Sequence, residues 1–205
     1  MKVRLSVLSS AVKRMVKSCD RSLLDCTVPS GYIIGKAFYG IDLRTRGSGN
    51  IGATNAYREL GPKAAAAVFI CDFLKGVLAV WIGGSTPLLA LACATAAIVG
   101  NDWSVFLHFK SGKGVACGVG AFTFICPWAT LSAFVVWLLV FLMTRIVSLA
   151  SIVAAPVVVL VIYLAHMPME YVIFSALAAA IIIGKHHSNI RRLLAGEEKK
   201  ITRDK

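Results

Sequence analysis

Long apolar stretches separated by short polar segments form the main pattern along this chain. Clear apolar stretches cover Pro62–Ile82, Leu88–Leu107, Val147–Ala165 and Tyr171–Gly184. Stretches of about 20 mostly apolar residues are typical of helices that cross a bilayer. None of them alternates in the manner of a membrane β-strand. The pattern therefore predicts an all-α integral membrane protein, built as a polytopic helical bundle.

The uncharged stretch Val115–Thr144 is too long for one membrane helix. As a single helix it would measure about 45 Å, against a hydrocarbon core of about 30 Å. Because proline interrupts helical hydrogen bonding, we expect a break at Cys126-Pro127 and two spans. Only this arrangement places the basic loops and the basic tail on one face, which the positive-inside rule makes cytoplasmic. The prediction is six clear transmembrane helices and a cytoplasmic C-terminus.

The N-terminal part differs from the rest. Residues 1–27 form a basic segment that is not clearly transmembrane, because Lys and Arg interrupt every apolar run, and a surface helix is one interpretation. The stretch Val28–Tyr39 is too short to span a bilayer, so we expect a partial or irregular first helix. Residues 28–185 form the predicted membrane-embedded domain, and residues 186–205 the cytoplasmic basic tail.

Composition agrees with this picture and adds a charge preference. Hydrophobic residues make up 58% of the 205 residues and charged residues only 16%, with a formal net charge of +12. Basic loops follow the positive-inside rule and also attract anionic substrates and lipid headgroups. Nucleic-acid binding is not expected, because the basic residues are spread over short loops. The cysteines form no CxxC pair, so no metal site is predicted.

The polar stretch Asp42–Asn55 is basic and rich in glycine. Its Gly47-Ser-Gly-Asn-Ile-Gly52 run matches the dinucleotide spacing GxGxxG, but no apolar strand precedes it and no βαβ unit surrounds it. Glycines bring backbone N–H groups close to an anion, and a helix that starts behind them directs its positive end there. We interpret the stretch as a phosphate cradle, with a flexible cytoplasmic loop as the alternative. The candidate phosphate ligands here are Ser48, Gly49, Asn50, Asn55 and Arg58.

A second glycine-rich loop, Ser111-Gly-Lys-Gly114, resembles a Walker A loop without fitting it. Lys113 is followed by glycine, and Leu107 stands where the first glycine would be. A lysine between Gly112 and Gly114 still reaches a phosphate as a mobile point charge. An ordinary basic loop is the alternative.

Other polar residues stand in or beside the apolar stretches. Asp72 and Lys75 share one helix face, and charges at that depth are normally paired, so we predict a structural ion pair beneath the site. Ser148 opens a span, where helix capping is the alternative to phosphate binding. His186 and Asn189 follow the last span. There, a histidine serves as general base or phosphate donor, or as a solvated surface residue.

Together these segments resemble the bacterial acyl-phosphate glycerol-3-phosphate acyltransferase family. The resemblance covers roughly residues 29–198, with several separate motifs in the same order and at compatible distances. The motifs are Gly47-Ser-Gly-Asn-Ile-Gly-Ala-Thr-Asn55 with Arg58 and Gly61, Asp72-Phe-Leu-Lys-Gly76, Lys110-Ser-Gly-Lys-Gly-Val-Ala116, Val147-Ser-Leu-Ala-Ser151, and His186 to Asn189 with Arg192-Leu-Leu-Ala-Gly196.

The resemblance implies a bacterial plasma (inner) membrane enzyme of seven helices with its active site on the cytoplasmic side. It implies transfer of a fatty acyl group from acyl phosphate to the 1-hydroxyl of glycerol 3-phosphate, giving lysophosphatidic acid and inorganic phosphate. No cofactor and no metal are expected. The expected partners are the two substrates and the lipid bilayer, and other enzymes of phospholipid synthesis are candidates.

By resemblance, one site collects residues from every motif. Arg58 and Lys113 are assigned to phosphates, and His186 and Asn189 to glycerol 3-phosphate. The predicted catalytic residues are His186, Lys113 and Ser48. The predicted binding residues are Ser48, Gly49, Asn50, Asn55, Arg58, Gly112, Lys113, Gly114, Ser148, His186 and Asn189.

The expected reaction needs no acyl-enzyme, because phosphate is already a good leaving group and no Ser-His-Asp constellation is visible. Positioning and charge stabilisation supply the acceleration. The base is either His186 or a phosphate oxygen of the substrate, and the sequence leaves both open.

Two features depart from the family pattern. Charged residues replace the usual apolar first helix, and Gly100-Asn101 stands where Gly-His is common. Two other functions stay open at this point, a membrane transporter of a phosphate-bearing solute and a non-catalytic phospholipid-binding protein. A transport path would need polar groups near the midplane from both halves of the chain, whereas these motifs gather on one face.

Overall fold

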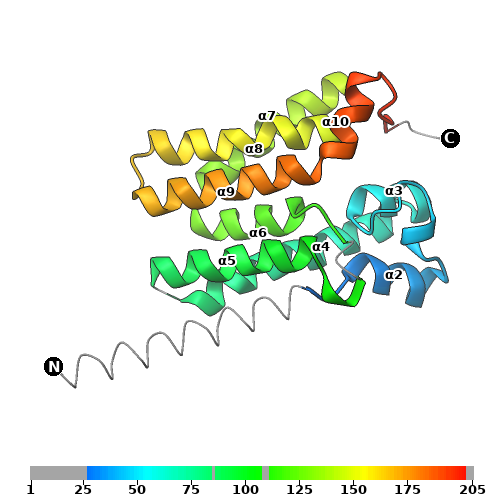
Figure 1. Cartoon of the computed structure of the whole chain (residues 1–205), viewed down its shortest axis with the longest axis horizontal. Coiled ribbons are helices and arrows are strands. Elements are labelled where there is room, and N and C mark those ends of the chain that lie inside the picture. Colours follow the sequence, from blue (N-terminus) through cyan, green and yellow to red (C-terminus); the bar gives the residue numbers. More distant parts are fainter. Residues whose placement is uncertain (1–26, 85, 108–110, 202–205) are drawn as a thin grey trace.

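The computed structural model describes residues 27–84, 86–107 and 111–201, and these residues are helical with short connections (Figure 1). The predicted basic segment, residues 1–27, lies outside the described residues except for Thr27. The helices are α2 (Ser30–Tyr39), α3 (Ala53–Leu60), α4 (Pro62–Gly83), α5 (Pro87–Asp102), α6 (Val115–Ile125), α7 (Pro127–Thr144), α8 (Val147–Leu164), α9 (Met169–Lys185) and α10 (His187–Leu194), with 3₁₀ turns η1 (Leu43–Thr45) and η2 (Val105–Leu107).

Three described helices, α4, α7 and α8, are long and apolar enough to cross a membrane. The bent pair α9 and α10 supplies a fourth if it is counted as one span, whereas α5 and α6 are apolar but shorter. An all-α membrane protein is therefore confirmed, and the count of six spans stays a prediction. The short α2 takes the place of the expected partial first helix.

The predicted break at Cys126-Pro127 is present. Helix α6 ends at Ile125, Cys126 adopts a non-helical conformation with φ −148° and ψ 85°, and α7 starts at Pro127. Proline fits the first helical position because its missing N–H has no partner to bind there. One apolar stretch thus becomes two helices.

The apolar stretch Leu88–Leu107 was expected to be helical throughout, and this is wrong for its end. Helix α5 stops at Asp102. The Asp102 carbonyl oxygen accepts a hydrogen bond from Lys185 Nζ at 2.6 Å, and the Ser104 hydroxyl donates to the carbonyl oxygen of Thr27. These tertiary contacts satisfy polar groups beyond the helix end, so the chain turns away there.

The helices form two groups, which are joined by contacts of α6 with α7 and of α5 with α9. Helix α4 packs on α5 and α6, whereas α8 packs on α7 and α9. The short helices α3 and α10 gather at one end of the molecule, and the α8–α9 turn lies at the other end (Figure 1). All segments that carry the predicted site motifs therefore meet at the end with α3 and α10.

Glycine allows α4 and α6 to touch backbone to backbone. A methyl group on Gly76 would overlap the carbonyl oxygen of Cys117, and one on Gly120 would overlap that of Phe73. Small residues at such contacts are typical of helix packing in membranes. The predicted ion pair is also present at α4, since Lys75 Nζ lies 2.7 Å from Asp72 Oδ1, which in turn accepts from Ser30 Oγ of α2.

Candidate functional site

A cavity of about 300 Å³ is lined by residues of both helix groups and by residues of α3 and α10. Its polar end is formed by both glycine-rich loops and by residues around α10. Its apolar arm runs between α6, α7, α8 and α9. The predicted residues that line it are Ser48, Asn50, Asn55, Arg58, Gly112, Lys113, Gly114, Ser148, His186 and Asn189, and the ion-pair residue Asp72 lines it too.

The first glycine-rich loop is held by the side chain of Asn55. Its Oδ1 accepts from Ser48 N at 2.9 Å, and its Nδ2 donates to the carbonyl oxygens of Leu43 and Arg46, each at 3.1 Å. Asn55 is thus committed to the loop itself. Gly49 does not line the cavity, but its φ of +70° gives the loop a turn that favours glycine.

The two glycine-rich loops are tied together. Asn50 accepts from Gly52 N at 2.7 Å and donates to the Ser111 carbonyl oxygen at 3.1 Å. Gly112 N donates to the Asn101 carbonyl oxygen at 3.1 Å, so the end of α5 supports the second loop. Segments far apart in sequence therefore form one continuous wall on which Lys113 stands.

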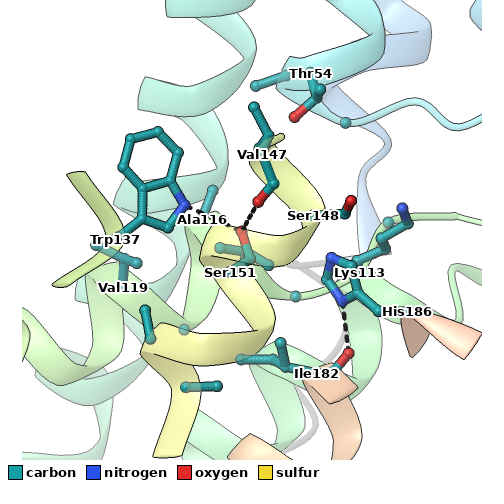
Figure 2. A pocket seen from close by; sticks show the side chains of 18 of the residues that line it. Thr54, Lys113, Ala116, Val119, Trp137, Val147, Ser148, Ser151, Ile182 and His186 are labelled. Carbon is teal, nitrogen blue, oxygen red and sulfur yellow. Dashed lines mark hydrogen bonds between the residues drawn. The ribbon is translucent and has the colours of Figure 1, made fainter. Parts of the chain in front are cut away.

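Lys113 is a half-buried cation of this wall. It lies beside Ser148 and His186, which come from α8 and the junction of α9 and α10 (Figure 2). Its Nζ donates to Asn189 Oδ1. The pKa of Lys113 is lowered to about 8, mainly by burial; Glu198 acts to raise it, whereas the nearby cations Arg192 and Arg58 contribute to the lowering.

His186 is buried and oriented by a backbone contact. Its Nδ1 lies 2.7 Å from the carbonyl oxygen of Ile182 (Figure 2). A carbonyl oxygen only accepts, so Nδ1 carries the hydrogen and Nε2 is left as an acceptor. Burial lowers the pKa of His186 to about 4, which keeps the ring neutral near pH 7.

Glu198 is a site residue that the sequence analysis missed. Its Oε1 accepts from Ser148 Oγ at 2.7 Å and from Asn189 Nδ2 at 2.6 Å, and its Oε2 accepts from Arg192 Nε at 2.6 Å. Burial raises the pKa of Glu198, but these three donors outweigh it, so that the pKa lies below its usual value. In the sequence, the only signal was an acidic pair, Glu197-Glu198, inside a mostly basic tail.

The tail around Glu198 crosses the polar end of the cavity. Arg58 Nη2 donates to the Lys199 carbonyl oxygen at 2.9 Å, and Ile201 N donates to the Arg145 carbonyl oxygen at 2.8 Å. The tail therefore links α3 to the α7–α8 connection. Arg58, predicted as a phosphate ligand, is engaged by this tail while it lines the cavity.

The apolar arm was not predicted residue by residue. Trp137 lies along it, and its Nε1 donates to Ser151 Oγ at 3.2 Å, which in turn donates to the Val147 carbonyl oxygen at 3.0 Å (Figure 2). These bonds satisfy the polar atoms among apolar walls. The arrangement offers cations and donors for phosphate groups at one end and an apolar lining for a hydrocarbon chain beyond it.

The fold and the amphipathic site are those of an integral membrane acyltransferase. Comparisons with known proteins establish this class. A family model described as glycerol-3-phosphate acyltransferase matches residues 23–196. The chain belongs to the glycerol-3-phosphate acyltransferase family. It is 46% identical over 177 residues to glycerol-3-phosphate acyltransferase 2 of Moorella thermoacetica, covering 85% of this chain and 91% of that protein.

Other relatives and solved structures agree. Glycerol-3-phosphate acyltransferase of Desulforudis audaxviator is 43% identical over 183 residues, covering 88% of this chain and 92% of its own. The crystal structure of PlsY (YgiH), an integral membrane glycerol 3-phosphate acyltransferase, in its glycerol 3-phosphate form gives a TM-score of 0.88 at 37% identity, over 92% of this chain and 96% of that one. Its lysophosphatidic acid form gives a TM-score of 0.86 at 36% identity, over 92% and 95%.

Within the described residues, no group of three or more His, Cys, Asp or Glu is placed to hold a metal ion.

Proposed function

We propose that this acyltransferase moves a fatty acyl group from an acyl phosphate to the 1-hydroxyl of glycerol 3-phosphate, without an acyl-enzyme. The products are lysophosphatidic acid and inorganic phosphate. Solved structures of PlsY in glycerol 3-phosphate and lysophosphatidic acid forms support the acceptor and the product. The donor and the direct transfer are inferred from the site.

One observation carries the proposal, the continuity of the cationic end with the apolar arm in a single cavity. An acyl phosphate has an anionic head joined directly to a hydrocarbon chain, so it fits across this junction. Lys113 and Arg58 supply charge for phosphates at the head end, and Ser48 lies on the same wall.

In the proposed reaction, the 1-hydroxyl oxygen attacks the acyl carbonyl carbon. The new ester bond forms as the bond from the carbonyl carbon to the phosphate oxygen breaks, and inorganic phosphate leaves. A pKa of about 4 makes His186 a weak base. We therefore assign the hydroxyl proton to a phosphate oxygen of a substrate, whose pKa is about 6. His186 Nε2 then orients glycerol 3-phosphate as a hydrogen-bond acceptor.

The test is transfer by purified protein given palmitoyl phosphate and glycerol 3-phosphate. Inorganic phosphate and lysophosphatidic acid should appear in equal amounts, and palmitoyl coenzyme A should give no product. Lys113→Ala should lower kcat/KM by about 10²-fold, since a phosphate loses a charged partner. Phosphate release without lysophosphatidic acid would refute transfer, and full activity in Lys113→Ala would refute the site assignment.

The absence of an acyl-enzyme has its own test. Protein incubated with palmitoyl phosphate alone should keep its mass, since no side chain becomes acylated. A stoichiometric acyl adduct that glycerol 3-phosphate then removes would show a covalent intermediate and contradict direct transfer.

We also propose a bacterial inner-membrane location with the site on the cytoplasmic face, and a role beside other enzymes of phospholipid synthesis. The basic loops and tail support the orientation through the positive-inside rule.

A further inference from the structure

The apolar arm of the cavity follows one face of each surrounding helix. On α6 the lining positions recur at helical spacing from Val115 to Phe122, and on α8 they recur from Ser148 to Val158. From His186 at the junction of α9 and α10, the lining positions run back along α9 to Ser175. These helices thus carry lining residues from the polar end to a common distal end at Phe122, Val158 and Ser175.

The distal end is closed by packed side chains. One turn beyond Phe122 or Val158, the residues Cys126 and Ile162 belong to the buried core and do not line the cavity. Phe122 itself is 5% exposed, and its ring packs on that of Phe174 with centroids 5.1 Å apart. The Ser175 hydroxyl donates to the Val172 carbonyl oxygen at 2.9 Å, so it presents no unsatisfied polar atom there.

The arm has a length that is meaningful for a hydrocarbon chain. From Ser148 to Val158 the helix advances about 15 Å at about 1.5 Å per residue. An extended chain advances about 1.2 Å per bond, judging from an extended polypeptide with three bonds per residue. The arm therefore holds about 12 to 14 carbon–carbon bonds before it meets Phe122.

We infer that Phe122 is the residue that limits acyl-chain length, by closing the distal end of the arm. The inference rests on the proposed function, since it names a determinant of donor specificity in that same site. Removing the Phe122 ring frees about one helical turn, about 5.4 Å. That distance corresponds to about four more methylene groups.

The experiment compares kcat/KM for acyl phosphates from octanoyl to stearoyl in the native protein and three variants. Phe122→Ala opens the distal end. Phe124→Ala is the matched control, because Phe124 lies on the same helix and is 51% exposed on the outside. Ala155→Leu fills the arm between Ser148 and Val158, because Ala155 lines it part of the way along.

The expected result is opposite shifts for the two arm variants. Phe122→Ala should raise kcat/KM for stearoyl relative to lauroyl phosphate by about tenfold, because added methylenes find apolar surface to bury. Ala155→Leu should lower the same ratio, and Phe124→Ala should leave it unchanged. The same profile in Phe122→Ala and Phe124→Ala would overturn the inference. Should Phe122→Ala fail to fold, an unchanged profile in Ala155→Leu would overturn it.

A binding measurement separates this inference from the proposed function. Alkyl phosphates from lauryl to stearyl have the same head and chain but no acyl group to transfer. Their dissociation constants should show the same shifts with chain length in the variants. Shifts in binding without any acyl transfer would uphold the role of Phe122 and refute the proposed reaction. Acyl transfer in which neither kcat/KM nor the dissociation constants shift with chain length would uphold the proposed reaction and refute the role of Phe122.

Discussion

Lys113 is a half-buried cation at the polar end of the site. Gly112 lets its loop lie against Asn101 and Gly114 lets it lie against Asp102, and Asn189 Oδ1 accepts a hydrogen bond from its ammonium group. Burial lowers its pKa to about 8, so it carries its charge near neutral pH and loses it on the alkaline side. The charge that we propose for phosphate binding is therefore present below about pH 8 and disappears as the pH rises through that value.

We expect kcat/KM to fall above about pH 8 in the native protein, since this ratio reports groups of the free enzyme. The phosphate of the substrate titrates near pH 6 and does not produce this limb. Lys113→Gln should lower kcat/KM about 10²-fold and abolish the alkaline limb in the remaining activity. The measurement is the pH profile of both proteins, and an unchanged limb in Lys113→Gln would assign it to another group.

Glu198 stabilises the polar end through three donors, Ser148, Asn189 and Arg192. Glu198→Ala should lower the free energy of unfolding by about 2 kcal/mol, because hydrogen bonds to a buried carboxylate are lost. Because the pKa of Glu198 is lower in the folded state than its unfolded value, this stabilisation is present at neutral pH. It is lost as the pH falls through the folded pKa.

The measurement for Glu198 is thermal unfolding in detergent, with Glu197→Ala as the exposed neighbour for control. Equal midpoints for the two variants would show that the three donors find other partners without loss.

At the scale of elements, the contact of α4 with α6 determines where the second glycine-rich loop stands. A methyl group at Gly120 would overlap the Phe73 carbonyl oxygen, which belongs to backbone and cannot rotate away. Helix α6 begins directly after Gly114, so moving α6 moves the loop that carries Lys113. Packing between two apolar helices therefore affects the position of Lys113 in the candidate site.

Gly120→Ala should destabilise the protein by about 1 to 3 kcal/mol through overpacking. It should also reduce activity in the fraction that stays folded. Gly184→Ala in α9 is the matched control, because a methyl group there meets nothing within 4 Å. The measurements are unfolding midpoint and kcat/KM, and tolerance of both changes would mean that α4 and α6 separate without cost.

At the scale of the whole molecule, the two ends differ in character. The site and the basic tail lie at the end with α3 and α10, whereas the α8–α9 turn with His166 lies at the other end (Figure 1). A membrane protein with this asymmetry has a preferred orientation.

In a cysteine-free background, His166→Cys should react with a membrane-impermeant maleimide in intact cells. Glu197→Cys should react only after the membrane is permeabilised. Both positions are exposed, so accessibility depends on the side of the membrane. Labelling of Glu197→Cys in intact cells would reverse the proposed orientation.

Much of the fold follows from local pattern, whereas part of the site does not. Pro127 predicted the break between α6 and α7, because its missing N–H removes a helical hydrogen bond within one turn. The end of α5 at Asp102 was not predictable, since its partner Lys185 lies far along the chain. Glu198 was missed for the same reason, because its three donors come together only in the folded chain.

Local sequence pattern was enough to identify an all-helical membrane protein and to predict two glycine-rich loops for anion binding, since apolar run length, glycine and charge act locally. The sequence motifs also indicated the family without any structural information. The folded chain was needed to show that Asn55 holds its own loop, that a carboxylate lies among the predicted phosphate-binding residues, and that an apolar arm ends at Phe122. These depend on distances between remote segments, which packing of the helices sets and local sequence does not encode.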